Sequence, residues 1–242
     1  MAINIDTVYQ KVLALANKEQ RGYITPQEFN LMADKAQKEI FDSYFHDVKM
    51  AYHKPTKSNM TFADDMELLQ EKLHPFKTST TFTQVANDAT ASLPSALYLI
   101  DIILLNNIEV EELTKQEVAY TENNPLTKAT KTRPVYVRED ATFTNNVSNK
   151  VITLYPTPTE ATTYSISYYA KPATPKWGYV VVKGRALYNS SNTYTTHFQL
   201  HECEEEILVS RILQLTGVII EKPGIMEVGT VEKASIKQEQ ND

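Results

Sequence analysis

Apolar residues recur with a helical period over a long stretch near the N-terminus. Between Phe29 and Val48 they return every three or four positions, and no glycine or proline interrupts them before Pro55. The start of this stretch is also well marked. Thr25-Pro26-Gln27-Glu28 has the pattern of a capping box, with proline at the first helical position. The sequence therefore predicts a long helix from Ile24 to about Ala51, with a broad apolar face that needs packing partners.

Further helices are predicted at both ends of the chain. A first helix is expected over 6–20, a third over 61–73, and C-terminal helices over 200–215 and after Pro223. The short turn between the first two helices predicts an antiparallel helical hairpin. Because all these segments carry an apolar stripe, we expect the N- and C-terminal helices to form one bundle.

The middle of the chain has the pattern of β-structure. The continuous apolar run of Leu97–Leu105 predicts a strand buried on both faces. A second capping box at Thr114 predicts a short helix over 114–122. Segments rich in Val, Ile, Thr and Tyr predict further strands over 78–83, 135–137, 151–155, 164–170 and 179–182.

The predicted fold class is therefore α+β, with a central, mainly antiparallel β-region between two helical parts. The expected divisions are a helical part over 1–75, a β-rich region with one short helix over 76–196, and C-terminal helices over 197–242. The C-terminal helices are expected to pack back on the N-terminal ones. The chain then forms one discontinuous domain with a β lobe.

Composition excludes several classes of function. Among 242 residues, 42% are hydrophobic and 22% charged, which indicates a globular chain. The net charge of −6 argues against binding nucleic acid through its phosphates. No glycine lies between Tyr23 and Trp177, which excludes a phosphate loop there. The N-terminus lacks a signal-peptide pattern and no apolar run could span a bilayer, so we expect a protein made in the cytoplasm with no membrane partner.

The sequence predicts no metal site. His201-Glu202 begins like a zinc-protease helix, but Glu205 stands where the second histidine is required. His197 and His201 are four residues apart and could hold a metal if both were helical. The favoured interpretation has His197 before the helix and His201 in its first turn. Cys203 lies on the apolar stripe and is interpreted as a buried hydrophobe rather than a nucleophile.

Carboxylates offer only a weak case for an enzyme. Asp101 could be an acid with a raised pKa, but a residue at a strand edge or one bonded to a helix terminus is favoured. A glycan hydrolase using Asp101, Glu109 or Glu111 is a third hypothesis that their spacing does not support. The acidic runs over 109–112 and 204–206 are interpreted as solvated faces. No catalytic residue, cofactor or metal is predicted.

Aromatic residues of the β-region allow an alternative function. A platform of these side chains could bind sugars, as in a receptor- or glycan-binding module of a virion. Roles in the core or in a protein interface are favoured, since strand alternation turns some of these residues inward. The residues concerned are Tyr164, Tyr168, Tyr169, Trp177 and Tyr179.

Several motifs resemble those of virion neck proteins of short-tailed bacteriophages, most closely the crAss-like phages of gut Bacteroidetes. The layout is also similar to that of tail adaptors, in which N- and C-terminal helices bracket a β-region. The motifs are Ile24-Thr25-Pro26-Gln27-Glu28-Phe29, Asn124-Pro125-Leu126-Thr127-Lys128, Arg133-Pro134-Val135-Tyr136, Ile152-Thr153-Leu154-Tyr155-Pro156, Tyr168-Tyr169-Ala170-Lys171-Pro172 with Trp177, and the helices over 200–240.

This resemblance implies a structural virion protein without catalytic activity. It implies a ring, commonly of about twelve copies, that binds the portal and neighbouring neck or tail rings. DNA would pass through the ring without sequence-specific binding. In such adaptors the C-terminal segment often reaches the next ring, which here gives a partner-docking set of Ile225, Met226, Val228, Val231 and Ile236. Exposure and composition add 123–133 and 184–196 as expected contact regions.

Overall fold

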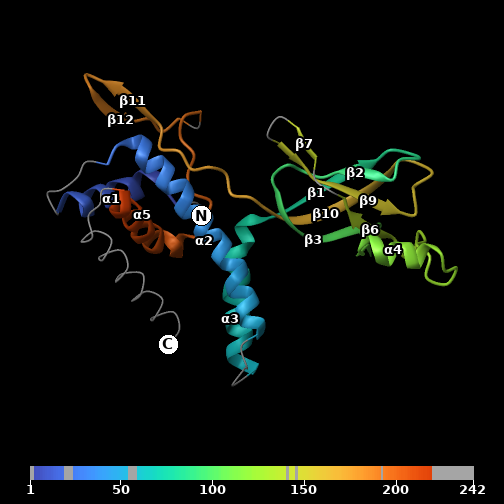
Figure 1. Cartoon of the computed structure of the whole chain (residues 1–242). Coiled ribbons are helices and arrows are strands. Elements are labelled where there is room, and N and C mark those ends of the chain that lie inside the picture. The colour runs from blue at the N-terminus through green and yellow to red at the C-terminus, as the bar shows by residue number, and fades with distance from the viewer. Residues whose placement is uncertain are drawn as a thin grey trace. The chain divides into compact units, whose positions relative to one another are not determined.

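The chain divides into two compact units. The computed structural model describes residues 3–18, 24–53, 59–139, 142–144, 147–191 and 193–219. Unit 1 comprises Met1–Pro75 and Pro172–Asp242, and unit 2 comprises Phe76–Lys171 (Figure 1). The division expected from the sequence, with a β-rich region over 76–196, stays a prediction; residues from Pro172 onward group here with the N-terminal helices in unit 1.

Unit 1 is helical and carries one β-hairpin. Helix α5 packs against both α1 and α2, and α3 packs against α2. The elements are α1 (Ile5–Lys18), α2 (Pro26–His53), α3 (Asn59–Leu73), β11 (Tyr179–Val182), β12 (Arg185–Tyr188), the 3-10 turn η2 (Glu202–Glu204) and α5 (Glu205–Ile219), while the 3-10 turn η1 (His74–Phe76) leads into unit 2. The single bundle expected from the sequence also includes the helix after Pro223, which lies outside the described residues.

The predicted capping box at the start of α2 is confirmed. The amide of Glu28 donates to the Thr25 hydroxyl at 3.3 Å, and the Thr25 amide donates to the Glu28 carboxylate at 2.9 Å. These two bonds satisfy amides that would otherwise lack a partner at the helix end. The second predicted box, Thr114 with Glu117, caps α4 (Lys115–Glu122) in the same way.

The α2 cap makes folding stability depend on pH. The hydrogen bonds from the Thr25 hydroxyl and amide lower the pKa of Glu28 below its usual value of 4.5. A carboxylate with a lowered pKa in the folded state stabilises the fold above pH 4.5, and this contribution is lost as the pH falls through the lowered pKa. We therefore expect Glu28→Gln to show a smaller loss of stability between pH 6 and pH 3 than the wild-type chain. Urea denaturation at both pH values tests this; equal losses would contradict it.

Unit 2 contains two four-stranded sheets and a small hairpin. The pairings are antiparallel except that between β5 and β6, as the sequence predicts for a mainly antiparallel region. The first sheet has the order β1 (Lys77–Gln84), β10 (Thr162–Ala170), β3 (Leu97–Leu105), β4 (Ile108–Glu109). The second has the order β2 (Thr90–Ser92), β9 (Val151–Tyr155), β6 (Val135–Arg138), β5 (Glu111–Glu112), and the hairpin pairs β7 (Thr142–Thr144) with β8 (Val147–Asn149).

The two sheets of unit 2 share one hydrophobic core. Ile103 of β3 and Ile166 of β10 are paired in register and fully buried. The second sheet contributes Ile152 and Leu154 of β9 to the same cluster. Val118 of α4 is also buried.

The prediction that β3 is buried on both faces is wrong. Leu97, Ile103 and Leu105 are buried, whereas Leu99 and Asp101 are exposed. Two β-bulges in the pairing with β10 interrupt the alternation of faces along the strand, and Ile102 and Leu104 are only partly buried. Asp101 is the extra residue of a β-bulge in the pairing with β10, and its carboxylate lies 2.8 Å from the Lys77 ammonium in an exposed ion pair.

Two predictions for the start of the C-terminal helix are also wrong. Cys203 is exposed rather than buried, and Glu204 is buried rather than solvated. The cause is local: α5 begins only at Glu205, so the 3-10 turn before it shifts the apolar stripe out of phase. His201 lies before this turn, not within the helix, and its imidazole accepts a hydrogen bond from the Cys203 amide at 3.4 Å.

Glu204 takes part in a buried ion pair. Its carboxylate lies 2.9 Å from the ammonium of Lys72 at the end of α3, and the two side chains are only 3% and 13% exposed. Tyr44 of α2 lies beside them. Burial, followed by the negative charge of Glu204, raises the pKa of the Tyr44 hydroxyl well above its usual range. The cluster therefore joins α2, α3 and η2 inside unit 1.

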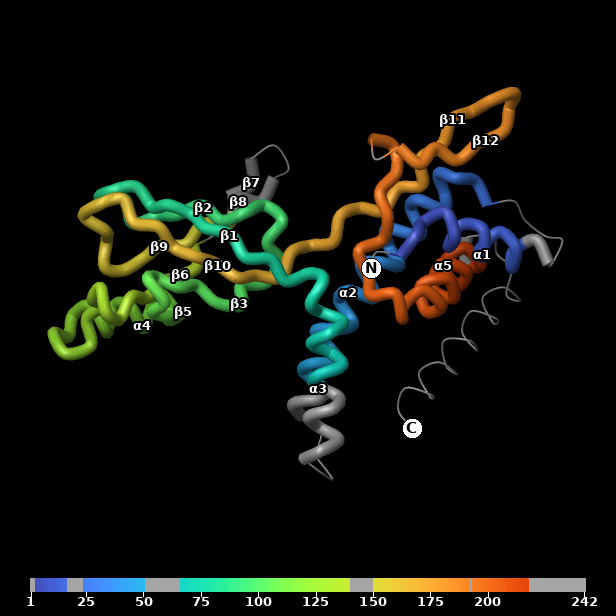
Figure 2. Tube along the Cα trace, turned by 180° about the vertical axis from the view of Figure 1, so that it is seen from behind, coloured from blue at the N-terminus to red at the C-terminus, as the bar shows by residue number. Residues whose placement is uncertain are grey.

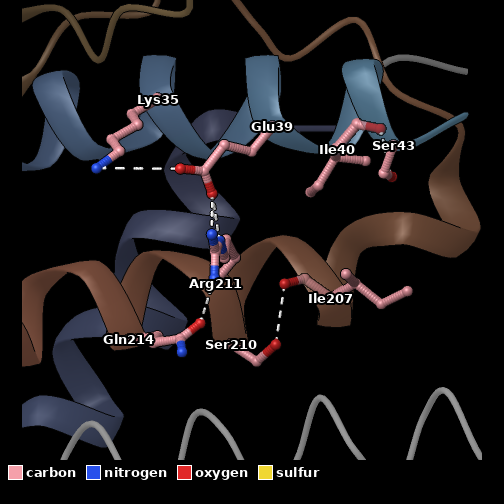
Figure 3. Close-up of polar contacts among 8 residues, drawn as sticks. All are labelled: Lys35, Glu39, Ile40, Ser43, Ile207, Ser210, Arg211 and Gln214. Carbon is pink, nitrogen blue, oxygen red and sulfur yellow. Dashed lines mark hydrogen bonds and ion pairs between the residues drawn. The ribbon is translucent and has the colours of Figure 1, made fainter. Parts of the chain in front are cut away.

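A second polar cluster joins α2 to α5. Arg211 forms an ion pair with Glu39 and donates a hydrogen bond to Gln214, and Lys35 lies 3.9 Å from the same glutamate (Figure 3). The Arg211 side chain is 23% exposed. A guanidinium held by two acceptors fixes the position of one helix along the other.

Candidate interaction surfaces

The carboxylates considered for catalysis do not form a site. Asp101 is held by Lys77, and Glu111 lies 3.1 Å from Arg133 on the surface of unit 2. Glu109 is exposed at the edge of its sheet. In the part of the chain that the structure describes, no three His, Cys, Asp or Glu side chains are grouped to hold a metal ion. The same part contains no helix of the length and apolarity needed to cross a membrane.

The five aromatic residues considered for sugar binding do not form an exposed platform. Tyr164 and Tyr168 are buried in the shared core of unit 2. Trp177 is buried in unit 1, where it stacks on Tyr179. Most of this aromatic surface is therefore used for packing, which is the interpretation that the sequence favours.

The loop after α4 presents the most exposed large apolar side chain of the described residues. Leu126 is 93% exposed, and Tyr120, on α4 itself, is 80% exposed. This loop consists of residues 123–133. The sequence predicts it as a contact region, and it lies within the part of the chain that the structure describes. We call α4 and residues 123–133 the α4 surface.

Hydrogen bonds fix the conformation of this loop. The Asn124 carboxamide oxygen accepts from the Leu126 amide at 3.0 Å, and the Asn124 carbonyl accepts from the Thr127 amide at 3.1 Å. The Thr127 hydroxyl donates to the carbonyl of Thr121 in α4 at 3.2 Å. At the start of such a turn, an asparagine side chain commonly forms a hydrogen bond with the backbone two residues later. Leu126 is therefore held outward by its neighbours.

The far end of the loop is anchored to unit 2. Ala129 is buried, and its amide donates to the Glu122 carboxylate at 3.4 Å. Lys128 lies 3.6 Å from the same carboxylate. An apolar side chain on a loop tied at both ends can enter a partner's pocket with little loss of conformational freedom. This arrangement suits protein binding rather than catalysis.

The β11–β12 hairpin is the second exposed apolar element. Its two-residue turn places Lys183 and Gly184 at φ +49° and +77°, the left-handed region that tight hairpin turns require. Val180 pairs with Leu187 and Val182 with Arg185, so these four side chains share one face. Both views show the hairpin projecting at one end of unit 1 (Figures 1 and 2), and Arg185 and Leu187 of its second strand line a hollow beside Leu13 of α1. Its large apolar residues are exposed, most of all Val181 at 63%.

Trp177 anchors the base of this hairpin. Its ring stacks on Tyr179 and Tyr188 at centroid distances of 5.7 and 5.8 Å, one from each strand. It also packs on Tyr9 of α1, and its indole N–H donates to the Asp6 carboxylate at 2.9 Å. A two-stranded hairpin is at best marginally stable alone, so this contact with α1 holds it in place.

The third predicted surface lies outside the described residues. It comprises the docking residues Ile225, Met226, Val228, Val231 and Ile236. The other expected contact region, 184–196, includes strand β12, which the sequence-based prediction missed. A signal was present, because Lys183-Gly184 lies between two short β-prone segments of equal length.

Part of the chain matches a known protein family. Residues 60–178 match the family model described as SU10 adaptor protein. The matched region is just under half of the chain; it includes all of unit 2 with its α4 surface and ends before the hairpin. No curated protein matches the chain. The match supports a relation of this region to bacteriophage adaptor proteins. It does not separate short-tailed from other phages and does not indicate closeness to crAss-like phages.

Proposed function

We propose that the protein is a ring-forming component of a bacteriophage neck. In this proposal, copies assemble beneath the portal, join the head to the tail, and continue the channel through which DNA passes. The match of residues 60–178 to the adaptor family is the observation that carries the proposal. The resemblance to tail adaptors implies about twelve copies, and a single repeated contact between neighbours can close such a ring.

Exposed apolar elements on the two units support an assembly role. A closed ring needs two different surfaces on each copy, because each copy contacts one neighbour on either side. Binding to portal and tail proteins needs further surface. Unit 2 offers the α4 surface around Leu126, and unit 1 offers the hairpin around Val181. Both are held in defined conformations by hydrogen bonds or aromatic packing.

The proposal assigns further contacts to the C-terminal segment. Residues 223–242 carry the docking set of Ile225, Met226, Val228, Val231 and Ile236, and contact the neighbouring ring. The C-terminal helices over 197–242 pack back on the N-terminal helices in one bundle. The net charge of −6 suits a channel wall that does not retain passing DNA by attraction.

Native mass spectrometry and negative-stain imaging test this function. The purified chain would be measured alone and with its cognate portal assembly. A closed ring, formed alone or only on the portal, is the expected result. A chain that stays monomeric or dimeric at all concentrations and never binds the portal would refute the proposed function.

The α4 surface gives a sharper test of portal or ring binding. Leu126→Ser should weaken binding about tenfold, because truncating an exposed anchor of an interface removes its apolar contact with the partner. The free energy of unfolding should change by less than about 0.5 kcal/mol, since Leu126 packs against little of its own chain. Binding would be measured by biolayer interferometry against the portal assembly and the assembled neck.

Val85→Ser serves as the matched control for this variant. Val85 is also an exposed apolar residue of unit 2, but it lies outside the α4 surface. It should leave both binding and stability unchanged. If the Leu126 variant bound both assemblies with wild-type affinity, the α4 surface would not be a contact region.

A further inference from the structure

We propose that the β11–β12 hairpin of one copy docks into the groove between α1 and α5 of a second copy. The inference rests on the proposed ring and names the pair of surfaces that would join neighbouring subunits. Both surfaces belong to unit 1.

The hairpin has the properties of an element that inserts into a groove of another protein. One face carries Val180, Val182 and Leu187, all exposed, and Val181 is exposed on the other face. Three consecutive exposed valines on a projecting element are unusual unless another surface covers them. At the tip, Lys183 and Arg185 are exposed, and neither forms an ion pair within the described residues.

The groove has complementary properties. It lies between α1 and α5, has a volume of ≈ 340 Å³, and is lined by Lys11, Ala14, Leu15, Glu206 and Val209. Val209 is buried, and Leu15 is 36% exposed although it belongs to the apolar stripe of α1. The surface between the two helices is therefore partly apolar and open.

The charges at the groove leave one carboxylate available. The Lys11 ammonium lies 2.8 Å from the Glu205 carboxylate, so these two charges compensate each other. Glu206 also lines the groove, is exposed, and forms no ion pair within the described residues. It can receive Arg185 or Lys183 of an incoming hairpin while the valines cover Leu15.

Charge complementarity favours a second copy as the occupant. The whole chain has a net charge of −6, yet the hairpin tip is basic. A basic tip is attracted to the acidic surface of another copy, where it meets the carboxylate of Glu206 at the edge of the groove. This attraction orients the contact more than it strengthens it. Most of the affinity comes from covering the exposed apolar residues.

The contact is heterologous, because the β11–β12 hairpin and the groove between α1 and α5 are different surfaces of one unit. Each copy that inserts its hairpin into a neighbour still offers its own groove to the next. This is the type of contact that generates rings when the rotation between copies closes.

Cysteine cross-linking tests the contact directly. Cys203 would first be replaced by serine, so that each variant carries one thiol. Val182→Cys and Leu15→Cys chains, mixed and assembled with the portal under mild oxidation, should form a cross-linked dimer, because Val182 shares the face of Arg185. Neither variant alone should do so. Leu126→Cys, more exposed than either, is the matched control and should not cross-link to Leu15→Cys.

Charge reversal gives a second measurement. Arg185→Glu should weaken assembly. The concentration at half-maximal assembly, measured by mass photometry, should rise about fivefold, in line with the loss of a surface ion pair. Adding Glu206→Arg should restore assembly. Failure of the second change to restore assembly would count against the assigned pairing.

The outcomes separate this inference from the proposed function. Rings that form without the mixed dimer would overturn the hairpin contact and leave the proposed function intact. A dimer formed by Val182→Cys alone would indicate hairpin-to-hairpin contact and also overturn it. A cross-link between Leu15→Cys and Val228→Cys within one chain would show that the chain's own C-terminal segment occupies the groove. That result would also overturn the hairpin contact. Absence of any assembly would overturn both proposals.

Discussion

Trp177→Ala is expected to lower the free energy of unfolding by about 3–5 kcal/mol, the range for removing a buried tryptophan. Trp177 is 3% exposed, and its indole packs against the Tyr9 ring in a tilted arrangement at a centroid distance of 4.4 Å. Its N–H group also donates to Asp6, and that carboxylate would lose its partner. Because the same ring anchors both strands of the β11–β12 hairpin, the variant should also disorder this hairpin.

Circular dichroism during urea denaturation would measure this loss. Fluorescence is unsuitable, because Trp177 is the one tryptophan in the sequence. Trp177→Phe is the matched control: it keeps the aromatic packing and loses the hydrogen bond, so we expect a smaller loss of stability. Faster hydrogen exchange of the β11 and β12 amides in the alanine variant would report the disordered hairpin. A stable alanine variant with protected hairpin amides would contradict the assigned anchor.

Lys72→Ala is expected to lower the free energy of unfolding by about 3–5 kcal/mol, because it leaves a buried carboxylate without its counter-ion. The remaining charge belongs to Glu204, whose side chain is 3% exposed. The Tyr44 hydroxyl beside it cannot compensate this charge fully. The loss should therefore exceed that of any exposed ion pair in the chain.

Two variants test this interpretation by the same urea denaturation. Lys38→Ala removes an ion pair to Asp34 at 2.6 Å on the surface of α2 and should cost less than about 1 kcal/mol. Lys72→Met with Glu204→Leu removes both buried charges and should recover most of the stability lost in Lys72→Ala. If Lys72→Ala cost no more than Lys38→Ala, the ion pair would not be buried in solution.

Helix starts could be predicted because their signals are local. The capping boxes at Thr25 and Thr114 involve residues only three positions apart, so the bonds form wherever the helix forms. The apolar run of Leu97–Leu105 likewise coincides with the observed bounds of β3. The very short strands β2, β4 and β5 were missed because two or three residues carry no periodic pattern.

The candidate surfaces could be predicted only as regions. Asparagine and proline mark 123–133 as a turn-rich segment, and the hydrogen bonds of Asn124 follow from that local chemistry. The exposure of Leu126 does not, because an apolar residue in a loop can equally be turned into the core. The groove between α1 and α5 joins residues nearly 200 positions apart and has no local signal.

The sequence by itself determined the capped starts of α2 and α4, the α+β class and the mainly antiparallel pairing, since these depend on neighbouring residues and on side-chain period. The tertiary structure decided which faces are covered. Burial depends on the element packed opposite, so Leu99 and Asp101 of β3 are exposed. For the same reason Glu204, beside Lys72, is inside and its neighbour Cys203 is outside.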